Sequence, residues 1–562
     1  MYKISHGIAL QNIFLATLIS TMGFGTFVFA QNIASEESGS LIVEPILGQQ
    51  FVTALHDYLE EGGSELLELK KFYAAQAYQP IWADGTTDSM LALLTAIEQA
   101  PKHGMSVSRY NTAELEALWV AANTPEDFAL LEYIAAQSYV KFAKELNAGM
   151  LDPRGIPNPG ADHDEMYATR YVPKTSDLLD AVADAADKSA YYKTLQPSSP
   201  EYAEMLKLKA ELESLISSNG WGPVVPNGRT LRLGNSSGRV AALRLRLDQR
   251  GYEPTDLTSP EYDNALVEVV KLFQQDFGLN ADGVIGPQTL TSINAQPDER
   301  LKQVIVNLER LRWMNYDLGD RHVYVNIPDF RASIIDDSKP TLSFRVVVGK
   351  NKYQTTEFSD VMTHMVINPS WNVPNSIATE EYLPQLRSDP TVLLRQNIQM
   401  MVRSSGQLID SSRLDYAYFT EDNFPFFLKQ TPGSGNALGR VKFMFPNRFN
   451  IYMHDTPARS LFTKDARAFS HGCVRVQKPL EFAHALLSLQ TNDPKSLFES
   501  ILSSGEETQI NLAKPVPVHI VYRTAWINRD GEAQFRHDIY GRDKLVYDAL
   551  VNAGFTTPAI GS

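Results

Sequence analysis

Cysteine, long apolar runs and positive charge are all scarce in this sequence. Cys473 is the only cysteine among 562 residues, and an internal disulfide needs two, so none contributes to the fold. Apart from residues 13–29, no segment stays apolar over the roughly 20 residues that a membrane-spanning helix needs. The chain has 51 lysines and arginines against 66 aspartates and glutamates, a net charge of −15. This balance argues against nucleic acid or an anionic membrane surface as a partner.

The N-terminus has the pattern of an export segment. Lys3 precedes the apolar run 13–29, and Ala30 follows that run directly before Gln31. We expect either a signal peptide cleaved after Ala30 or an uncleaved segment that anchors the protein in the inner membrane. In both cases we expect the body of the protein to be exported, and residues 31–45 form a polar tether.

The length of the chain predicts two to four domains, because it is too long for one hydrophobic core. Between residues 46 and 225, apolar residues recur at three- and four-residue spacing, which is typical of helices. We predict a helical scaffold domain over this region and assign it no chemistry. Its predicted helices cover residues 52–59, 64–72, 89–98 and 127–146, and the last of them stops before Gly149.

A second unit is predicted over residues 231–294, after a linker rich in proline and glycine at 222–230. Helical patterns at 240–249 and 262–277 are followed by the run Asp282-Gly283-Val284-Ile285-Gly286-Pro287-Gln288-Thr289. Its Asp-Gly and Gly-Pro pairs favour tight turns, and Pro287 suits the first position of a last short helix. The unit resembles a three-helix peptidoglycan-binding module, which implies peptidoglycan as a partner. The alternative is a helical spacer without a ligand site.

From about residue 300 the pattern becomes mostly β. A helix at 301–313 precedes strand-like runs at 322–327, 332–335, 342–348 and 361–367. An insertion at about 375–438 interrupts the strands with two predicted helices, 378–386 and 391–400, and with aromatic loops. Because proline and glycine flank it, we expect a mobile lid, with a rigid decoration as the alternative. The predicted β domain covers residues 300–545.

Residues 441–476 hold the only thiol of the chain and two histidines. Cys473 directly follows His471 and Gly472, and His454 lies upstream after a strand-like run. A thiol attacks as the thiolate, so it needs a base or a cation beside it. The pattern therefore predicts nucleophilic catalysis by Cys473. Residues two apart on a strand point to the same side, so spacing alone leaves both histidines as candidates for the base.

This segment resembles the active-site signature of the L,D-transpeptidases, cysteine enzymes that cross-link bacterial peptidoglycan. The resemblance rests on His454 and on the core Ser470-His471-Gly472-Cys473-Val474-Arg475. Asp455 stands where most relatives have glycine, a variant associated with the long, multi-domain branch of the family. The resemblance implies a multi-domain α+β protein with a helical N-terminal scaffold, a three-helix peptidoglycan-binding module and a mostly β, β-sandwich-like catalytic domain with a helical lid insertion.

The family also implies roles for the residues of the motif. Cys473 is the expected nucleophile and His454 the expected general base. The backbone carbonyl of Gly472 is expected to orient that base, and His471 to support the site. Asp455 follows His454 directly, so its carboxylate is expected to point away from the site.

Four further residues are candidates for substrate binding. Tyr452 lies two positions before His454 and should share its strand face. Ser470 is placed to hydrogen-bond near the thiolate. Arg475 either lowers the pKa of the thiol, holds a substrate carboxylate or braces the loop. Trp371 either lines the mouth of the site or packs in the core.

The resemblance implies acyl transfer without a metal or other cofactor. Cys473 would attack the third residue of a tetrapeptide stem and expel D-Ala, while backbone N–H groups around Gly472 form an oxyanion hole. The side-chain amine of a neighbouring stem would then take the acyl group and form a 3→3 cross-link. Carbapenems acylate the thiol in this family. Peptidoglycan is the expected partner, together with other cell-wall enzymes.

Three alternatives compete with this interpretation. The same thioester chemistry with water, a lipoprotein lysine or a free D-amino acid as acceptor describes an L,D-carboxypeptidase or a lipoprotein-attaching enzyme. A non-catalytic wall-binding protein would use only the module at 231–294. A zinc hydrolase would use His454, Asp455, His471 and Cys473, although their spacing is not a familiar zinc pattern.

Overall fold

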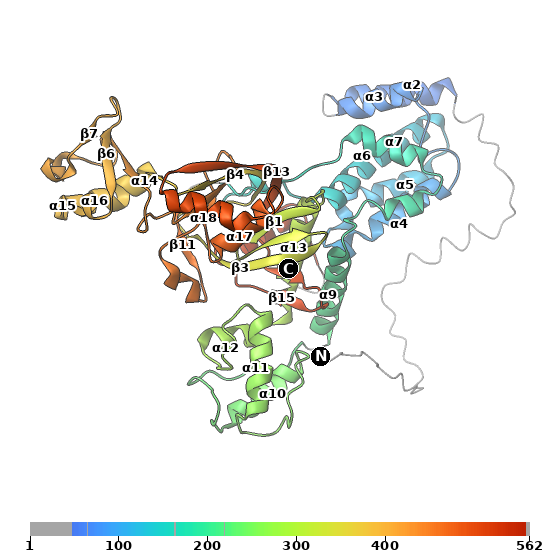
Figure 1. Cartoon of the computed structure of the whole chain (residues 1–562). Coiled ribbons are helices and arrows are strands. Elements are labelled where there is room, and N and C mark those ends of the chain that lie inside the picture. Colours follow the sequence, from blue (N-terminus) through green and yellow to red (C-terminus); the bar gives the residue numbers. More distant parts are fainter. Residues whose placement is uncertain (1–47, 64–65, 162–164, 219, 558–562) are drawn as a thin grey trace.

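The computed structural model describes residues 48–63, 66–161, 165–218 and 220–557. The predicted export segment and tether lie outside these ranges. Within them, no helix combines the length and the apolar character that crossing a membrane requires. The chain forms a helical N-terminal region, a small helical module, a central β domain and a lobe inserted into that domain (Figure 1). The predicted multi-domain α+β class is confirmed.

The N-terminal region is mostly helical, and its longest helix is α6 (Pro125–Ala148). Thr124 and Asp127 form a capping box, in which each side chain accepts a hydrogen bond from the backbone N–H of the other. Gly149 ends the helix with a φ of +90°, and a Cβ there would lie 2.6 Å from Glu309 of a later helix. The other helices are α2 (Gln49–Glu61), α3 (Leu67–Ala75), α4 (Asp88–Glu98), α5 (Thr112–Ala121), α7 (Thr175–Asp184), α8 (Lys188–Tyr192) and α9 (Pro200–Ser217).

A buried carboxylate organises the core of this region. Glu132 accepts hydrogen bonds from the hydroxyl of Tyr73 and from the backbone N–H groups of Ile81, Trp82 and Ala83. A buried carboxylate is stable only when it is hydrogen-bonded in this way. Tyr73 and Trp82 are themselves buried, so these aromatic residues pack the core of the region.

The three predicted helices of the module are present as α10 (Gly238–Asp248), α11 (Asn264–Asp276) and α12 (Pro287–Asn294). Leu231 and Ile285 form an antiparallel bridge that joins the start of the module to the turn before its last helix. The buried guanidinium of Arg246 donates to the carbonyls of Trp221 and Ala295. Val225 of the linker also exchanges two hydrogen bonds with the side chain of Asn294, so the linker is bound to the module.

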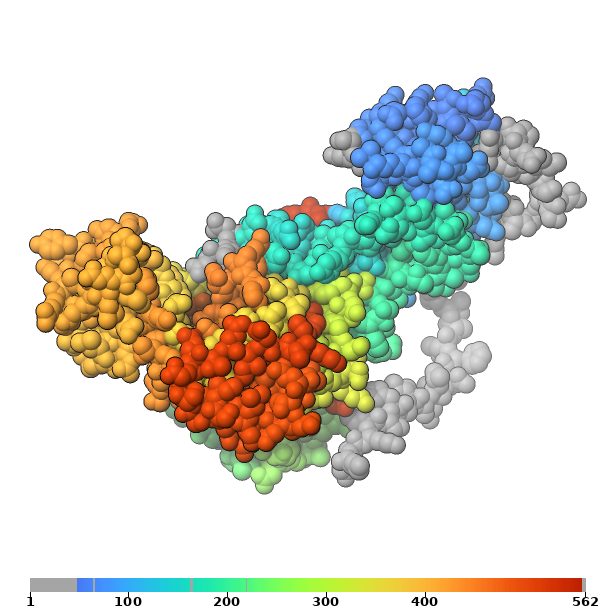
Figure 2. Space-filling model, turned by 45° about the horizontal axis from the view of Figure 1, so that its top comes forward, coloured from blue at the N-terminus to red at the C-terminus, as the bar shows by residue number. Residues whose placement is uncertain are grey.

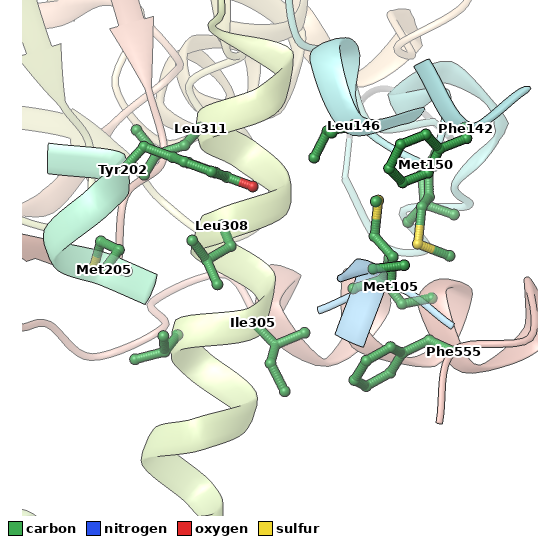
Figure 3. Packing of buried hydrophobic residues seen from close by; sticks show 14 of the residues in the cluster. Met105, Phe142, Leu146, Met150, Tyr202, Met205, Ile305, Leu308, Leu311 and Phe555 are labelled. Atoms are coloured by element: carbon green, nitrogen blue, oxygen red, sulfur yellow. The ribbon is translucent and has the colours of Figure 1, made fainter. Parts of the chain in front are cut away.

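Helix α13 (Pro297–Trp313) joins the N-terminal region to the β domain. Figure 3 shows Leu308 of this helix beside Tyr202 and Met205 of α9, with Ile305 facing a second cluster on the other side. That cluster contains Met105, Phe142, Leu146, Met150 and Phe555, which come from both ends of the chain. One hydrophobic core therefore runs from the N-terminal helices through α13 to the C-terminus.

Polar groups in α13 reinforce this packing. Glu309 and Arg312 are fully buried and form an ion pair of 2.6 Å. The other carboxylate oxygen of Glu309 accepts a hydrogen bond from the backbone N–H of Leu151 at 2.8 Å. Arg312 donates to the carbonyl of His103 at 2.7 Å. Both charged side chains of this pair thus hydrogen-bond to the backbone of the N-terminal region.

The central domain is a nine-stranded sheet in the order β11-β3-β12-β10-β9-β4-β13-β1-β2. Strand β2 also pairs with β3, so the sheet closes on itself around a core of its own. The four strands predicted between 322 and 367 are confirmed. The strands are β1 (Arg321–Asn326), β2 (Arg331–Asp336), β3 (Lys339–Gly349), β4 (Phe358–Ile367), β9 (Val441–Met444), β10 (Met453–His454), β11 (Ala468–Ser470), β12 (Val474–Val476) and β13 (Thr508–Val521).

Helices and a hairpin complete the domain. Helices α17 (Pro479–Leu487) and α18 (Pro494–Ser504) add apolar side chains to the core of the closed sheet. Three later elements pack into the core that contains α13 instead. They are the hairpin strands β14 (Ala525–Ile527) and β15 (Ala533–Phe535) and the last helix, α19 (Arg542–Asn552). The C-terminal segment therefore connects the sheet back to the N-terminal region.

The insertion is a compact lobe with its own core and a four-stranded sheet in the order β5-β8-β6-β7. Figure 2 shows this lobe, coloured yellow to orange, standing apart from the rest of the molecule. It contains β5 (Trp371–Val373), α14 (Asn375–Ile377), η5 (Ala378–Tyr382), α15 (Leu383–Ser388), α16 (Val392–Arg395), β6 (Ile398–Val402), β7 (Leu408–Ile409) and β8 (Phe426–Gln430).

The predicted helix at 391–400 was wrong in its second half. Helical structure ends with α16, and Asn397 adopts a φ of +54°, which breaks the helix. Residues 398–402 then form β6, which pairs with β8 over five residue pairs. The predicted helix at 378–386 is present as η5 and α15. The insertion is a mixed α/β lobe, not a helical one.

Candidate active site

The predicted base lies on strand β10, and the predicted nucleophile directly precedes the neighbouring strand β12. Strands β10 and β12 run parallel, with His454 opposite Arg475. The backbone N–H of Val474 donates to the carbonyl of Tyr452 at 3.0 Å. Cys473, the residue before β12, is therefore held beside the segment that leads into His454.

The thiol of Cys473 is partly exposed and contacts two upstream residues. Tyr452 hydrogen-bonds to the sulfur through its hydroxyl and its backbone N–H. The thiol also donates to the carbonyl of Asn450 across 3.7 Å. Burial raises the pKa of the Cys473 thiol to about 11, against the opposing effects of Tyr452 and of the charge on Arg475. The resting thiol is therefore protonated at neutral pH and must lose its proton to a base when it attacks.

His454 is buried and neutral. Burial, reinforced by the charge on Arg475, lowers the pKa of His454 to about 3. Its Nδ1 lies 2.5 Å from the backbone carbonyl of Asp455. Because a carbonyl only accepts, Nδ1 carries the proton and Nε2 keeps its lone pair, as a general base requires. Within the described chain no hydrogen bond joins His454 to the thiol, and such contacts commonly tighten only when substrate binds.

The carbonyl that orients His454 differs from the expected one. Asp455, not Gly472, supplies it, and the Gly472 carbonyl instead accepts a hydrogen bond from Thr355 Oγ1 at 2.7 Å. Gly472 has a φ of +103°, a conformation that favours glycine. This turn directs its carbonyl toward Thr355 and away from His454.

The carboxylate of Asp455 points away from the site, as expected. It lies 3.0 Å from Arg440 Nε and 3.3 Å from Arg459 Nη1. Asp455 therefore orients His454 through its backbone carbonyl, while its charge partly opposes the lowering of the pKa of His454.

The two residues before Gly472 face different neighbours. His471 Nε2 lies 2.8 Å from Glu381 Oε1 of the insertion, and its ring centroid is 4.6 Å from that of Tyr353. Burial lowers the pKa of His471, while Glu381 acts to raise it. Ser470 Oγ donates to the backbone carbonyl of Cys473 at 2.5 Å. Both residues thus hold the loop of the cysteine, and neither bonds to its sulfur.

Tyr452, Trp371 and Arg475 line the site around the thiol. The ring centroids of Tyr452 and His454 are 5.7 Å apart. Trp371, which is half-buried, hydrogen-bonds to the side chain of Tyr452 and also packs against the core of the inserted lobe. Arg475 is half-buried, and its Nε has no hydrogen-bond partner within the described residues. This Nε is itself buried, and the charge of the guanidinium acts on the thiol of Cys473.

The four residues of the zinc alternative do not converge. Asp455 is paired with arginines and His471 with Glu381. Across the described ranges, no three or more histidine, cysteine or acidic side chains are grouped as metal ligands.

Three residues that contact the motif were not predicted from the sequence. Glu381 and Tyr353 hold His471, and Thr355 holds Gly472. They lie far upstream, in the insertion and in the loop after β3. No local pattern links them to the motif, and a tertiary structure was needed to find them.

Comparisons with known proteins find three domains in this chain. Residues 320–518 match the L,D-transpeptidase catalytic domain, residues 67–208 the scaffold domain and residues 236–293 the "Putative peptidoglycan binding domain". A Haemophilus influenzae protein named "Putative L,D-transpeptidase" is 32% identical over 253 residues, which cover 45% of this chain and 50% of that protein. The match thus spans about half the length of this relative.

Two solved structures are similar over about half of the chain. An L,D-transpeptidase fragment from Xylanimonas cellulosilytica is 14% identical and covers 53% of this chain and 100% of its own, with a TM-score of 0.16. An L,D-transpeptidase from Stackebrandtia nassauensis is 13% identical and covers 53% of this chain and 97% of its own, with a TM-score of 0.20. Because both TM-scores are below 0.5, the fold rests on the geometry described above.

Proposed function

Because the chain contains an L,D-transpeptidase catalytic domain, a scaffold domain and a peptidoglycan-binding domain, we propose that it is an exported peptidoglycan L,D-transpeptidase. His454 takes the proton of the Cys473 thiol while the sulfur adds to the carbonyl carbon of the third residue of a tetrapeptide stem. The intermediate collapses to a thioester, and D-Ala leaves with that proton on its amine. The side-chain amine of a neighbouring stem then displaces the thiolate, which recovers a proton from the amine through His454. The product is a 3→3 cross-link.

The relative placement of Cys473 and His454 is the observation that carries this proposal. The thiol is protonated at rest, and the histidine on the adjacent strand is neutral with its Nδ1 proton fixed by a carbonyl. A neutral pair of this kind transfers the proton as the sulfur attacks, and no stable ion pair is needed beforehand. Tyr452 hydrogen-bonds to the sulfur and stabilises the thiolate as it forms.

We propose that Arg475, Trp371 and Tyr452 bind the stem peptide. The guanidinium of Arg475, whose charge acts on Cys473, is the proposed partner of a carboxylate of the stem. Trp371 and Tyr452, joined by a hydrogen bond, present an aromatic wall beside the thiol. The backbone N–H of Cys473 is the proposed oxyanion donor, and Ser470 and His471 support its loop.

The insertion is the proposed lid of the site. Its helical start touches the catalytic domain through charged groups: Glu381 meets His471 and Lys350, and Glu380 meets Lys352 and the hydroxyl of Tyr353. The rest of the lobe has a separate core. A lobe that is held to the site by exposed ion pairs can open at low energetic cost.

The remaining domains place this chemistry at the cell wall. We propose an export segment at 1–30, a scaffold at 46–225, a peptidoglycan-binding module at 231–294 and a catalytic domain at 300–545. A cavity of about 500 Å³ between the linker and α12, lined by Gly228, Pro287 and Thr291 among others, supports glycan or peptide binding by the module. The expected location is the periplasm, and other cell-wall enzymes are the expected neighbours.

Intact-protein mass spectrometry tests the proposal. The full chain and its Cys473→Ala variant are incubated with a carbapenem and, separately, with disaccharide-tetrapeptide. Covalent adducts on the wild type alone, with D-Ala release and a cross-linked dimer, would establish the transpeptidase. D-Ala release without dimer would indicate a carboxypeptidase, and transfer to a lipoprotein lysine or a D-amino acid would identify another acceptor.

Two outcomes would contradict the proposal. Equal product formation by Cys473→Ala would show that the nucleophile is misassigned and would favour metal hydrolysis, which chelation then tests. An unreactive wild type on every stem would leave a wall-binding protein without catalysis.

A further inference from the structure

Thr355 makes a buried contact with the peptide bond that precedes the cysteine. It lies in the loop after β3 and is fully buried. Its hydroxyl donates to the carbonyl of Gly472 at 2.7 Å and accepts from the backbone N–H of Gly349 at 2.9 Å. One side chain thus ties the end of β3 to the loop of the nucleophile.

This contact fixes the direction of the Cys473 N–H. The peptide bond between Gly472 and Cys473 is trans, and in a trans peptide the C=O and N–H point in opposite directions. Because Thr355 holds the carbonyl on one side, the N–H of Cys473 points to the other. Within the described chain, that N–H has no hydrogen-bond partner. A preoriented, unpaired N–H on the nucleophile is the geometry of an oxyanion-hole donor.

Two residues of the C-terminal segment hydrogen-bond to the loop that contains Thr355. The Tyr540 hydroxyl donates to the carbonyl of Gly349 at 2.6 Å and lies 3.3 Å from the backbone N–H of Thr355, from which it accepts. Arg542 donates to the carbonyl of Thr355 at 3.2 Å. Both residues follow position 518, where the match to the catalytic domain ends. The loop is therefore fixed by a part of this chain beyond the matched domain.

We infer that Thr355 is a positioning residue for acyl transfer, which aims the Cys473 N–H at the carbonyl oxygen of the substrate as negative charge develops on it. The inference rests on the proposed function. Removing the hydroxyl leaves the thiol and His454 in place but frees the Gly472–Cys473 peptide to rotate. The variant should therefore react more slowly wherever an oxyanion forms. Its rate in reactions that form no oxyanion should stay unchanged.

Two reagents separate these effects in the full-length protein. A carbapenem acylates Cys473 through a tetrahedral oxyanion, whereas iodoacetamide alkylates it by displacement at a saturated carbon. Thr355→Val keeps the shape and removes the hydroxyl, Thr355→Ser keeps the hydroxyl, and Thr356→Val is the matched control. Thr356 is the buried neighbour, and in the described structure its hydroxyl makes no hydrogen bond to residues 470–476.

We expect Thr355→Val to slow acylation at least about tenfold while alkylation stays within about twofold of wild type. Thr355→Ser and Thr356→Val should react like the wild type with both reagents. If Thr355→Val does not fold, Tyr540→Phe replaces it as the test, because Tyr540 hydrogen-bonds to the backbone of the same loop. This variant should show a smaller decrease in the acylation rate and no change in the alkylation rate.

Unchanged acylation in Thr355→Val, or an equal fall in both reactions, would overturn the inference. In the second case the threonine would serve the thiol or the fold in general. A wild type that iodoacetamide alkylates but that no carbapenem or stem peptide acylates would instead refute the proposed function, and the inference with it.

Discussion

His471 Nε2 and Glu381 Oε1 lie 2.8 Å apart, and this pair joins the cysteine motif to the inserted lobe. His471 is two positions before Cys473, and Glu381 belongs to the first helical turns of the insertion. Tyr353 packs against the same imidazole and also hydrogen-bonds to Glu380. The position of the lobe and the position of the nucleophile's loop are thus linked through one histidine.

We predict that Glu381→Gln loosens the lobe. Glu381 contacts His471, whose pKa is lowered, and forms an ion pair with Lys350. Partly exposed contacts of this kind contribute at most about 1 kcal/mol, which corresponds to about a fivefold change in the fraction of open molecules. Hydrogen exchange should therefore rise by up to that factor in residues 350–354 and 378–388, with a change in KM and little change in thermal stability. Asp389→Asn is the control, because Asp389 pairs with Arg395 inside the lobe. Equal exchange in both variants would disprove the link.

The two histidines should differ sharply in their effect on turnover. His454→Gln removes the neutral Nε2 base and should lower kcat by about 100-fold or more. His471→Gln keeps a side chain that can hydrogen-bond to Glu381 and should lower kcat by less than about tenfold, since this histidine supports the loop without touching the sulfur. Steady-state release of D-Ala measures both. A larger loss in His471→Gln than in His454→Gln would reverse the assignment.

The reactivity of the thiol should rise with pH well beyond neutrality. Burial raises the pKa of Cys473 to about 11, so the thiolate fraction increases about tenfold per pH unit throughout pH 7–10. The rate of alkylation by iodoacetamide should follow that slope. Tyr452→Phe should be slower at each pH, because Tyr452 stabilises the thiolate. A plateau reached by pH 7 would show an ionised thiol and would contradict the neutral pair.

Protonation should not inactivate the base, His454, until the pH falls well below the usual pKa of histidine. The pKa of His454 is lowered to about 3, so the folded protein keeps this imidazole neutral at pH 5, while the unfolded chain protonates it below about 6.5. Unfolded molecules thus bind more protons, and stability falls as the pH drops from 6.5 toward 3. Activity of molecules still folded at pH 5 should match that at pH 7. A midpoint near 6.5 in kcat would exclude His454 as the base.

Glu309→Gln should weaken the junction of the N-terminal region with α13. The substitution leaves the buried Arg312 without its counter-charge, which costs roughly 3 kcal/mol. Thermal unfolding followed by calorimetry should show a lower first transition. Glu299→Gln, on the exposed face of the same helix, should leave that transition unchanged.

The sequence was most informative where structure depends on neighbouring residues. The capping box at Thr124, the stop at Gly149 and the turns around Pro287 each act within a few positions, and the predicted helices there are confirmed. The motif also identified the candidate nucleophile and base, because spacing within a short segment is a local property.

Features that depend on distant partners could not be predicted in the same way. The sequence predicts helix at the start of β6 because the pairing partner of this strand, β8, lies beyond an intervening loop. The contacts of Glu381 with His471 and of Thr355 with Gly472 join separate segments. The orienting carbonyl at Asp455 depends on the exact path of β10, which residue identities alone do not specify.

The raised pKa of the only thiol has a chemical consequence. With a pKa of about 11, only about one thiol in ten thousand is ionised at pH 7. Peroxides and small-molecule disulfides react with the thiolate, not with the thiol. The sulfur is thus largely inert toward sulfenic acid formation and mixed-disulfide capping until a substrate arrives. The chain has no second cysteine that could reverse such oxidation through an internal disulfide. The raised pKa of Cys473 therefore protects its only thiol.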